Sequence, residues 1–270
     1  MSTDPAKLKA AATYNAAADH FDDEPLGFWS RIGRRTIERL TLSPGATVLD
    51  VGCGTGASAL PAAQRVGPGG RVIGVDLAER LLAIARQKAA AQGLANAEFR
   101  TGDMERLGYP DGHFDAVVSV FSIFFVPDMV RQARELWRMV RPGGSLAITT
   151  WGPRMFEPGT THWWDAVRAV RPDLVPAVSP WARITEPPAV RDLMREAGIA
   201  DVEVVAEVST QRLRSPEDWW AVVLGSGFRW TVDQLGPEAA DRVRKANLAH
   251  MRGIDAVETN AIYATARKPG

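Results

Sequence analysis

The chain has 270 residues, of which 46% are hydrophobic and 24% are charged, as in an ordinary globular protein with one large domain or two small ones. Basic and acidic residues number 32 each, so their formal charges cancel. No overall positive field is therefore present to attract nucleic acid or an acidic membrane surface, and the composition argues against both as partners.

Two helices are predicted in the first 45 residues. Residues 6–21 are rich in alanine and carry apolar side chains at helical spacing. A second amphipathic stretch lies between the break at 22–25 and the turn at 43–45. We treat residues 1–45 as a helical segment that precedes the main domain.

From residue 46 to residue 150, short apolar strands alternate with helices. The strands are predicted at 47–51, 71–75, 96–99, 117–120 and 146–150. Such alternation predicts an α/β fold, with a parallel sheet that is covered by helices on both faces. Sheets of this kind bind ligands beyond the carboxyl ends of their strands, and the motifs described next lie at such ends.

The most informative stretch is Val48–Gly56, in which a buried strand leads into a turn with three glycines. Glycine leaves bare backbone against which a ligand can lie, and the following helix directs free N–H groups toward the turn. Gly52, Gly54 and Gly56 have a G-x-G-x-G spacing, one residue shorter than the dinucleotide fingerprint G-x-G-x-x-G. Asp50 suits a ligand with a positive charge beside its carboxylate better than a pyrophosphate. The amino-acid moiety of S-adenosylmethionine (SAM) has both charges.

Asp76 ends the second strand and can accept hydrogen bonds from two ribose hydroxyls, although it can also cap the helix that follows. SAM and NAD both carry such a ribose. An NAD(P)-linked oxidoreductase is therefore an alternative, opposed by the glycine spacing, by Asp50 and by the lack of a Tyr-x-x-x-Lys pair. A non-catalytic SAM-binding module is a second alternative, which a filled acceptor pocket would favour.

Because these motifs occur together and in this order, the chain resembles the class I SAM-dependent methyltransferases. Among them it is most similar to the small-molecule enzymes of the ubiquinone/menaquinone-biosynthesis type. The resemblance covers about residues 45–152 and depends on residues 48–56, Asp76, 102–104, 114–118 and 141–144. It implies a Rossmann-like, seven-stranded, mostly parallel sheet whose last strand is antiparallel, and a lid over the cofactor from the segment before the first strand. The cofactor-binding residues that it implies in this SAM-binding core are Asp50, Gly52, Cys53, Gly54, Gly56, Asp76, Leu77, Gly102, Asp103, Met104, Ser119 and Val120.

The resemblance also implies roles for some of these residues. Leu77 and Met104 would pack on the two faces of the adenine, and Asp103 would accept a hydrogen bond from its exocyclic amine. The backbone of Ser119 and Val120 would face the methionine part. For Met104 the alternative is ordinary core packing, and for Asp103 it is a helix cap or a turn.

Residues 151–187 and 209–258 interrupt the alternation and are expected to build a cap, while 188–208 and 259–270 complete the core sheet. Most tryptophans lie outside 46–150, and the N/D/S-P-P-Y/F pattern of base-amine methyltransferases is absent after the fourth strand. We therefore expect a planar, apolar or aromatic small-molecule acceptor, with the alternative that the tryptophans form the cap's own core. The expected acceptor-binding residues are Phe121, Phe124, Trp163, Trp164 and Trp181.

Methyl transfer from a sulfonium is an in-line displacement, and alignment alone can supply on the order of 7–11 kcal/mol of the barrier. For a phenol, enol or amine acceptor, a base would contribute roughly 10²–10⁴-fold. His162 is the first candidate for this catalytic role and Tyr14 the second, with surface or packing roles as the alternative for both. No metal is expected. The acceptor, the methylated atom and the oligomeric state stay open.

The expected location is the cytoplasm. The single cysteine, Cys53, cannot form an intrachain disulfide, which fits a reducing compartment, and we interpret its small side chain as packing within the turn. The first residues lack the basic region and apolar core of a signal peptide. The longest apolar run, 116–126, contains two serines and is too short for a membrane span.

Overall fold

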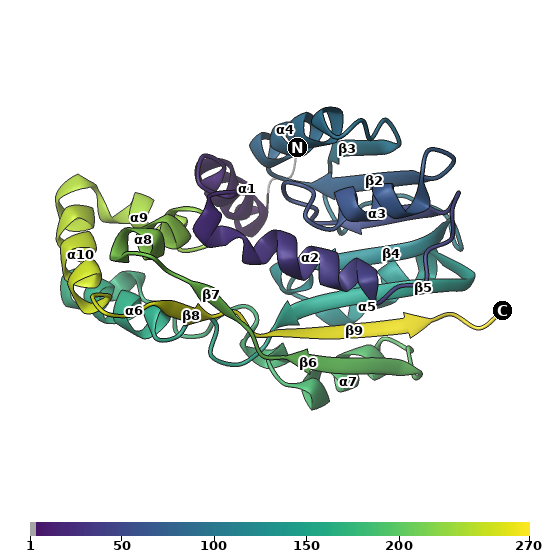
Figure 1. Ribbon diagram of the computed structural model, residues 1–270. Coiled ribbons are helices and arrows are strands. Elements are labelled where there is room, and N and C mark those ends of the chain that lie inside the picture. Colours follow the sequence, from purple (N-terminus) through teal and green to yellow (C-terminus); the bar gives the residue numbers. More distant parts are fainter. Residues whose placement is uncertain (1–3) are drawn as a thin grey trace.

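A seven-stranded sheet forms the centre of the computed structural model, which describes residues 4–270 (Figure 1). The strand order is β3-β2-β1-β4-β5-β9-β6. Strands β1 to β5 are parallel, and β9 is antiparallel to both β5 and β6, which confirms the expected α/β fold. The strands are β1 (Thr47–Val51), β2 (Arg71–Asp76), β3 (Ala97–Thr101), β4 (Phe114–Val120), β5 (Val140–Trp151), β6 (Val202–Glu207) and β9 (Ala261–Arg267).

The strand register explains why the motifs of the sequence meet at one edge of the sheet. Asp50 of β1 pairs with Gly74 of β2 and with Val118 of β4, so the carboxyl ends of these three strands lie side by side. Leu49 and Val48 are both buried, in two separate hydrophobic clusters, because successive side chains point to opposite faces. The sheet is therefore covered on both faces, as is usual for parallel strands.

Helices cover both faces of the sheet. Figure 1 shows α2 and α3 in front of it, and Thr36 of α2 shares a 2.8 Å hydrogen bond with Thr149 of β5. On the other face, α5 buries Met129, Ala133, Leu136 and Met139, which recur at helical spacing. Across residues 4–270, no helix has both the length and the apolar character that crossing a bilayer requires. The covering helices are α2 (Phe28–Glu38), α3 (Ala59–Val66), α4 (Glu79–Ala91), α5 (Met129–Met139) and α7 (Pro187–Glu196).

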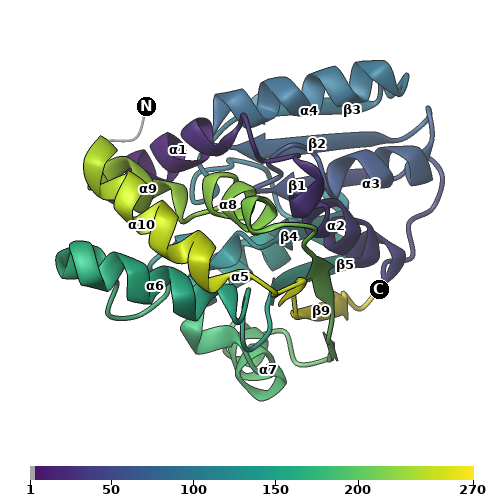
Figure 2. The ribbon, with the colours of Figure 1, turned by 60° about the vertical axis from the view of Figure 1, so that its left-hand side comes forward.

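Four further helices gather beyond the carboxyl edge of the sheet, and we call them the cap (Figures 1 and 2). A two-stranded ribbon of β7 (Thr210–Arg212) and β8 (Ala256–Glu258) leads into it. Helix α6 was not predicted, but the prolines of its region all lie outside it, so the helix is uninterrupted. The cap helices are α6 (Gly159–Val170), α8 (Pro216–Leu224), α9 (Arg229–Leu235) and α10 (Pro237–His250).

Helix α1 (Pro5–Ala17) lies between the cap and the sheet (Figure 1). The Asp4 side chain accepts a 2.9 Å hydrogen bond from the backbone N–H of Ala6, as a helix N-cap does. The helix ends four residues before the predicted end at residue 21. The chain turns there instead, with His20 donating to the carbonyl of Ala17.

Candidate active site

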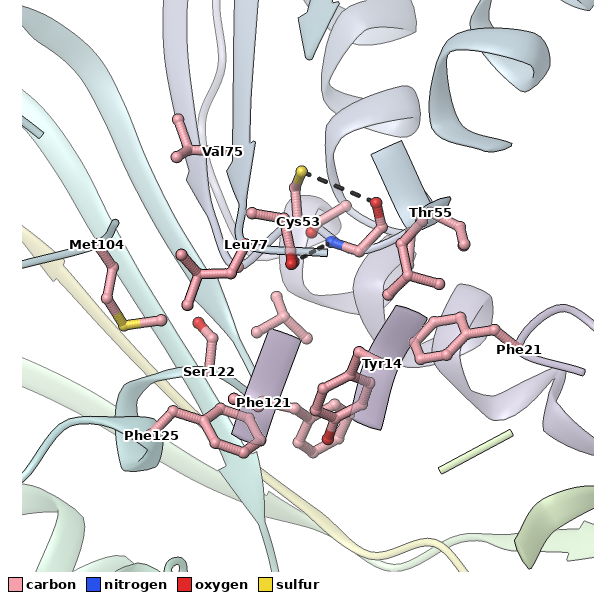
Figure 3. A pocket seen from close by; sticks show the side chains of 18 of the residues that line it. Tyr14, Phe21, Cys53, Thr55, Val75, Leu77, Met104, Phe121, Ser122 and Phe125 are labelled. Carbon is pink, nitrogen blue, oxygen red and sulfur yellow. Dashed lines mark hydrogen bonds between the residues drawn. The ribbon is translucent and has the colours of Figure 1, made fainter. Parts of the chain in front are cut away.

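A cavity at the carboxyl edge of the sheet is bounded by the turns after β1, β2 and β4 on one side and by α1 on the other (Figure 3). Ala10, Ala11 and Tyr14 contribute the α1 side. Of the residues expected at the site, those that line the cavity are the catalytic candidate Tyr14 and the binding residues Gly52, Cys53, Gly54, Asp76, Leu77, Gly102, Met104, Val120 and Phe121.

Gly52 brings bare backbone to the cavity at the end of β1. Its φ is 71°, in the left-handed region, and its N–H donates to the carbonyl of Val75 at 2.7 Å. A Cβ at this position would lie 2.3 Å from the Cβ of Ser122. Only glycine therefore fits between β1 and the turn that follows β4.

The rest of the glycine turn has a different environment. Gly54 (φ 53°) lines the cavity, and a Cβ there would meet Phe21 at 3.6 Å, an ordinary contact. Gly56 does not line the cavity. A Cβ at this position would lie 2.9 Å from Leu60, so glycine is needed here for packing. Burial raises the pKa of the Cys53 thiol well above its usual value, so this side chain is a neutral packing group.

Asp50 lies beneath the turn and does not itself line the cavity. Its Oδ2 accepts a 2.7 Å hydrogen bond from Ser58, which does line it, while Oδ1 is buried without a partner. Burial, and next the nearby Asp76, raise the pKa of Asp50 to about 7. An incompletely satisfied buried carboxylate next to a cavity favours a ligand with a positive charge, which fits the ammonium group of SAM.

Asp76 presents a carboxylate to the cavity from the end of β2. Its Oδ2 accepts from the N–H of Gly54 and its Oδ1 from the N–H of Ala78, both at 2.9 Å. Burial raises its pKa despite these bonds. Each oxygen keeps acceptor capacity, so the side chain can take two neighbouring hydroxyls, as on a ribose. Leu77 follows it into the same cavity, as Figure 3 shows.

The loop after β3 adds Gly102 and Met104 to the cavity but turns Asp103 away from it. The Asp103 Oδ2 pairs with Nζ of Lys7 at 2.7 Å, and its Oδ1 accepts from the N–H of Glu105 at 3.0 Å. Lys7 comes from α1. The carboxylate that was expected to accept from adenine is therefore engaged by the helix above the cavity.

Two serines shape the turn after β4. The Ser119 and Ser122 hydroxyls share a 2.7 Å hydrogen bond, and Ser122 donates to the carbonyl of Val51 at 2.6 Å. Ser119 is buried behind the cavity, whereas Val120 and Ser122 line it. These bonds join the end of β4 to the end of β1 and hold the turn against the glycine backbone.

Five aromatic side chains also line the cavity, and we call them the aromatic wall: Tyr14, Phe21, Trp29, Phe121 and Phe125. Phe21 stacks on Trp29 with ring centroids 5.3 Å apart, and Tyr14 meets the edge of Phe125 at 5.6 Å. Trp29 meets Phe121 at 5.5 Å. Figure 3 shows Tyr14, Phe121 and Phe125 gathered on the side away from Cys53. The wall is suited to a planar apolar molecule.

Tyr14 supplies the one hydroxyl of this wall. Burial, and then the charge of Asp76, raise the pKa of its phenol well above the usual value. The phenol therefore stays protonated at neutral pH. It can donate a hydrogen bond to a ligand but is a poor base.

Five other residues expected at the site lie elsewhere. Phe124 is buried under the wall, with its ring 4.9 Å from Phe125, and Trp181 packs on it at 5.6 Å. Trp163 and Trp164 pack on Phe228 inside the cap, and His162 stacks on His250 at 5.3 Å. The residues that do not line the cavity are Phe124, His162, Trp163, Trp164 and Trp181.

Other lining residues were not singled out from the sequence. Trp29 and Phe125 belong to the wall, and Thr55, Ser58 and Ser122 supply hydroxyls. A signal existed for Ser122, because it lies two residues after a predicted strand end. None existed for Trp29, whose place depends on how α2 crosses the sheet.

Comparison with known proteins agrees with this geometry. Residues 48–144 match the family model of the methyltransferase domain. Nocamycin O-methyltransferase from Saccharothrix syringae is 32% identical over 275 residues, covering 94% of this chain and 96% of that protein. Demethylmenaquinone methyltransferase from Listeria monocytogenes serotype 4a (strain HCC23) is 37% identical over 114 residues, covering 42% of this chain and 48% of that protein.

A solved structure shares the fold. Phosphoethanolamine N-methyltransferase 2 from Haemonchus contortus, solved in complex with S-adenosyl-L-methionine, superposes with a TM-score of 0.58 at 20% identity, covering 94% of this chain and 56% of that chain. The Saccharothrix relative extends the likeness over nearly the whole length of both chains. The cavity agrees with this relation, because its residues suit a nucleoside joined to a zwitterion. The chain therefore belongs to the SAM-dependent methyltransferases that act on small molecules.

Proposed function

We propose that the enzyme transfers the methyl group of SAM to an oxygen of a small, largely apolar ring compound that lies against the aromatic wall. The observation that carries this proposal is that two kinds of residue line the same cavity. One set, which we call the polar half, combines the glycine turn with Asp76, and the other is the aromatic wall. The polar half suits SAM, and the wall suits a planar acceptor next to it.

In the polar half, Asp76 accepts the two ribose hydroxyls, and Leu77 and Met104 pack against the adenine. Gly52 and Gly54 let the ligand lie on bare backbone, with the backbone of Val120 beside the methionine part. Three further residues contribute without lining the cavity. Gly56 and Ser119 hold the turns in place, and Asp50 attracts the ammonium group of SAM through its negative charge. The unpartnered Asp50 Oδ1 supports this assignment.

When bound, SAM supplies an electrophilic methyl group on a positively charged sulfur. The aromatic wall orients the acceptor and keeps water out, which is the main requirement of an in-line displacement. Tyr14 donates a hydrogen bond to the acceptor and removes no proton, because burial holds its pKa high. An acceptor with an acidic hydroxyl, such as a phenol or an enol, passes its proton to bulk water before it binds, and its oxygen anion then takes the methyl group as S-adenosylhomocysteine leaves. We assign no proton transfer to His162, which lies outside the cavity.

Further support for oxygen as the methylated atom is the name of the relative that matches over nearly the full length, nocamycin O-methyltransferase. The balanced charge of 32 basic and 32 acidic residues supports a small molecule over nucleic acid. A free, buried Cys53 supports a cytoplasmic location. We propose that the segments 151–187 and 209–258, together with residues 4–45 of the predicted 1–45 segment, cover the acceptor around a core of 46–150, 188–208 and 259–270. Residues 1–3 lie outside the part of the chain that the structure describes.

The test is a transfer assay with SAM labelled in its methyl group. The substrates are a panel of phenols and cyclic enols, each paired with its own methyl ether. Label is expected in products of the hydroxyl compounds and in none of the matched ethers. Transfer to ring carbons or amines, with none to oxygen, would contradict the proposal.

Replacing Tyr14 with Phe tests the role of its hydroxyl. Loss of one hydrogen bond is expected to lower kcat/KM for the acceptor about tenfold and leave the KM for SAM unchanged. The pH profile should keep its shape, since the phenol is protonated throughout. Tyr109→Phe is the control, because Tyr109 stacks on His113 away from the cavity. A shifted pH optimum in Tyr14→Phe would show instead that this phenol titrates during the reaction.

A further inference from the structure

Helix α1 is the part of the cavity boundary that lies outside the central sheet. Ala10, Ala11 and Tyr14 of α1 line the cavity, whereas the opposite side consists of strand ends and turns of the sheet. Each methyl transfer consumes one SAM molecule and leaves one S-adenosylhomocysteine, so the cofactor is exchanged at every turnover. The contacts that hold α1 over the cavity therefore bear on that exchange.

A group of three charged side chains fastens α1 to the cofactor side of the cavity. Nζ of Lys7 lies 2.7 Å from Asp103 Oδ2 and 2.5 Å from Glu105 Oε2. The exposed fractions of these side chains are 13% for Lys7, 15% for Asp103 and 22% for Glu105. The two acids belong to the loop whose Gly102 and Met104 line the polar half. The contact thus joins α1 to the loop after β3, which borders the polar half.

The other end of α1 is held more weakly. Arg80 of α4 donates to the backbone carbonyl of Asn15 at 2.8 Å and pairs with Asp19 at 2.5 Å. The Arg80 and Asp19 side chains are 52% and 65% exposed, so water and salt screen their attraction. The group around Lys7 is sheltered, and charges attract more strongly where water is scarce.

Two contacts join α1 to the cap instead of the core. Arg229 of α9 donates to the carbonyl of Ala16 at 3.0 Å, and the Lys9 ammonium lies 4.7 Å from the ring centroid of Trp230. If the group around Lys7 separates, α1 therefore stays attached to α9. Lys7 is therefore the sheltered cation that joins α1 to the loop after β3.

We propose that Lys7 is a positioning residue that holds α1 closed over the bound cofactor and so sets how fast S-adenosylhomocysteine leaves. Without its ammonium, Asp103 and Glu105 face each other as two sheltered carboxylates with no cation between them. Their repulsion and their recovered hydration both favour the open position. The proposal rests on the SAM site described above and is independent of which acceptor is methylated.

The first experiment measures release of S-adenosylhomocysteine by stopped flow after mixing with excess SAM. Lys7→Met is expected to raise the release rate about tenfold and the KM for SAM in parallel, with the KM for the acceptor unchanged. Lys7→Arg, which keeps the charge, should restore the wild-type rate within about threefold. Arg80→Met is the matched control at the exposed end of α1 and should change the rate less than Lys7→Met. Added salt should speed release from the wild type more than from Lys7→Met.

The second experiment needs no cofactor. Hydrogen exchange of peptides covering residues 5–17 should be faster in Lys7→Met than in the wild type, while peptides of β1 and β4 exchange unchanged. If Lys7→Met and the wild type release S-adenosylhomocysteine at the same rate, or if α1 exchanges equally in both, Lys7 does not hold the helix. Faster exchange without any SAM binding by the wild type would leave the helix contact standing and overturn the cofactor site.

Discussion

Gly52 and Gly54 share a left-handed backbone but differ in what surrounds them. An alanine at position 54 has room beside Phe21, so Gly54→Ala is expected to cost about 1–2 kcal/mol of folding free energy from its φ alone. Gly52→Ala adds a collision with Ser122 at 2.3 Å, which costs about 1–3 kcal/mol more and displaces the turn after β4. Urea unfolding and calorimetry with SAM measure both effects. Equal losses of stability in the two variants would contradict this account.

We expect Asp50 to make cofactor binding depend on pH. Its pKa is raised to about 7 in the free enzyme, and a bound ammonium favours the ionised carboxylate, so binding lowers that pKa. Below pH 7, SAM binding therefore releases a proton, and affinity rises by up to about tenfold per pH unit until it levels off above 7. Calorimetry at pH 6 in buffers of different ionisation enthalpy counts the proton. Asp50→Asn should bind SAM without this release, and an unchanged release in that variant would assign the proton to another group.

Single residues differed in how far their positions could be predicted. The positions of Asp76, Gly52 and Gly54 beside the cavity were predictable because they depend on local backbone and on the ends of single strands. Trp29 was not, because its ring reaches the cavity only through the path of α2 over the sheet. Trp163 could not be distinguished from a ligand-binding tryptophan, since composition does not reveal that neighbouring helices bury it completely.

At the scale of elements, one buried hydrogen bond joins the cap helices α8 and α10. Trp219 Nε1 donates to Asn247 Oδ1 at 2.6 Å, and both side chains are fully buried. Trp219→Phe leaves the amide oxygen without its donor, which is expected to cost about 1–3 kcal/mol of folding free energy. The measurement is the midpoint of urea unfolding, compared between variants whose unfolding free energy depends equally steeply on urea concentration. The partly exposed Trp220 gives the control Trp220→Phe, and an equal loss there would show that ring volume, not the hydrogen bond, is what matters.

Elements of the central sheet were predictable, and those of the cap were only partly so. A strand buried on both faces, such as Thr47–Val51, has a continuous apolar run that stands out in the sequence. Helix α6 was hidden because the prolines of its region suggested irregular chain, although none of them lies within Gly159–Val170. The end of α1 was misplaced by four residues, since alanines near a helix end favour continuation where tertiary contacts favour a turn.

At the scale of the whole molecule, the alternation of strands and helices was sufficient to predict the sheet and the edge at which the cavity lies. It was not sufficient to predict how α1 and the cap meet above that edge. Those contacts join residues far apart in the chain, as when Arg229 reaches the carbonyl of Ala16. Long-range pairs of this kind leave no periodic trace in the sequence.

The two parts of the cavity come from different stretches of the chain. The polar half is made by residues between 52 and 104, in turns that the sheet holds in place, whereas three of the five rings of the aromatic wall lie between residues 14 and 29. We therefore expect substitutions at Tyr14 and Trp29 to alter which molecule is modified more than they alter SAM binding. Over evolutionary time, such a chain can diversify its chemistry by drift in its first thirty residues.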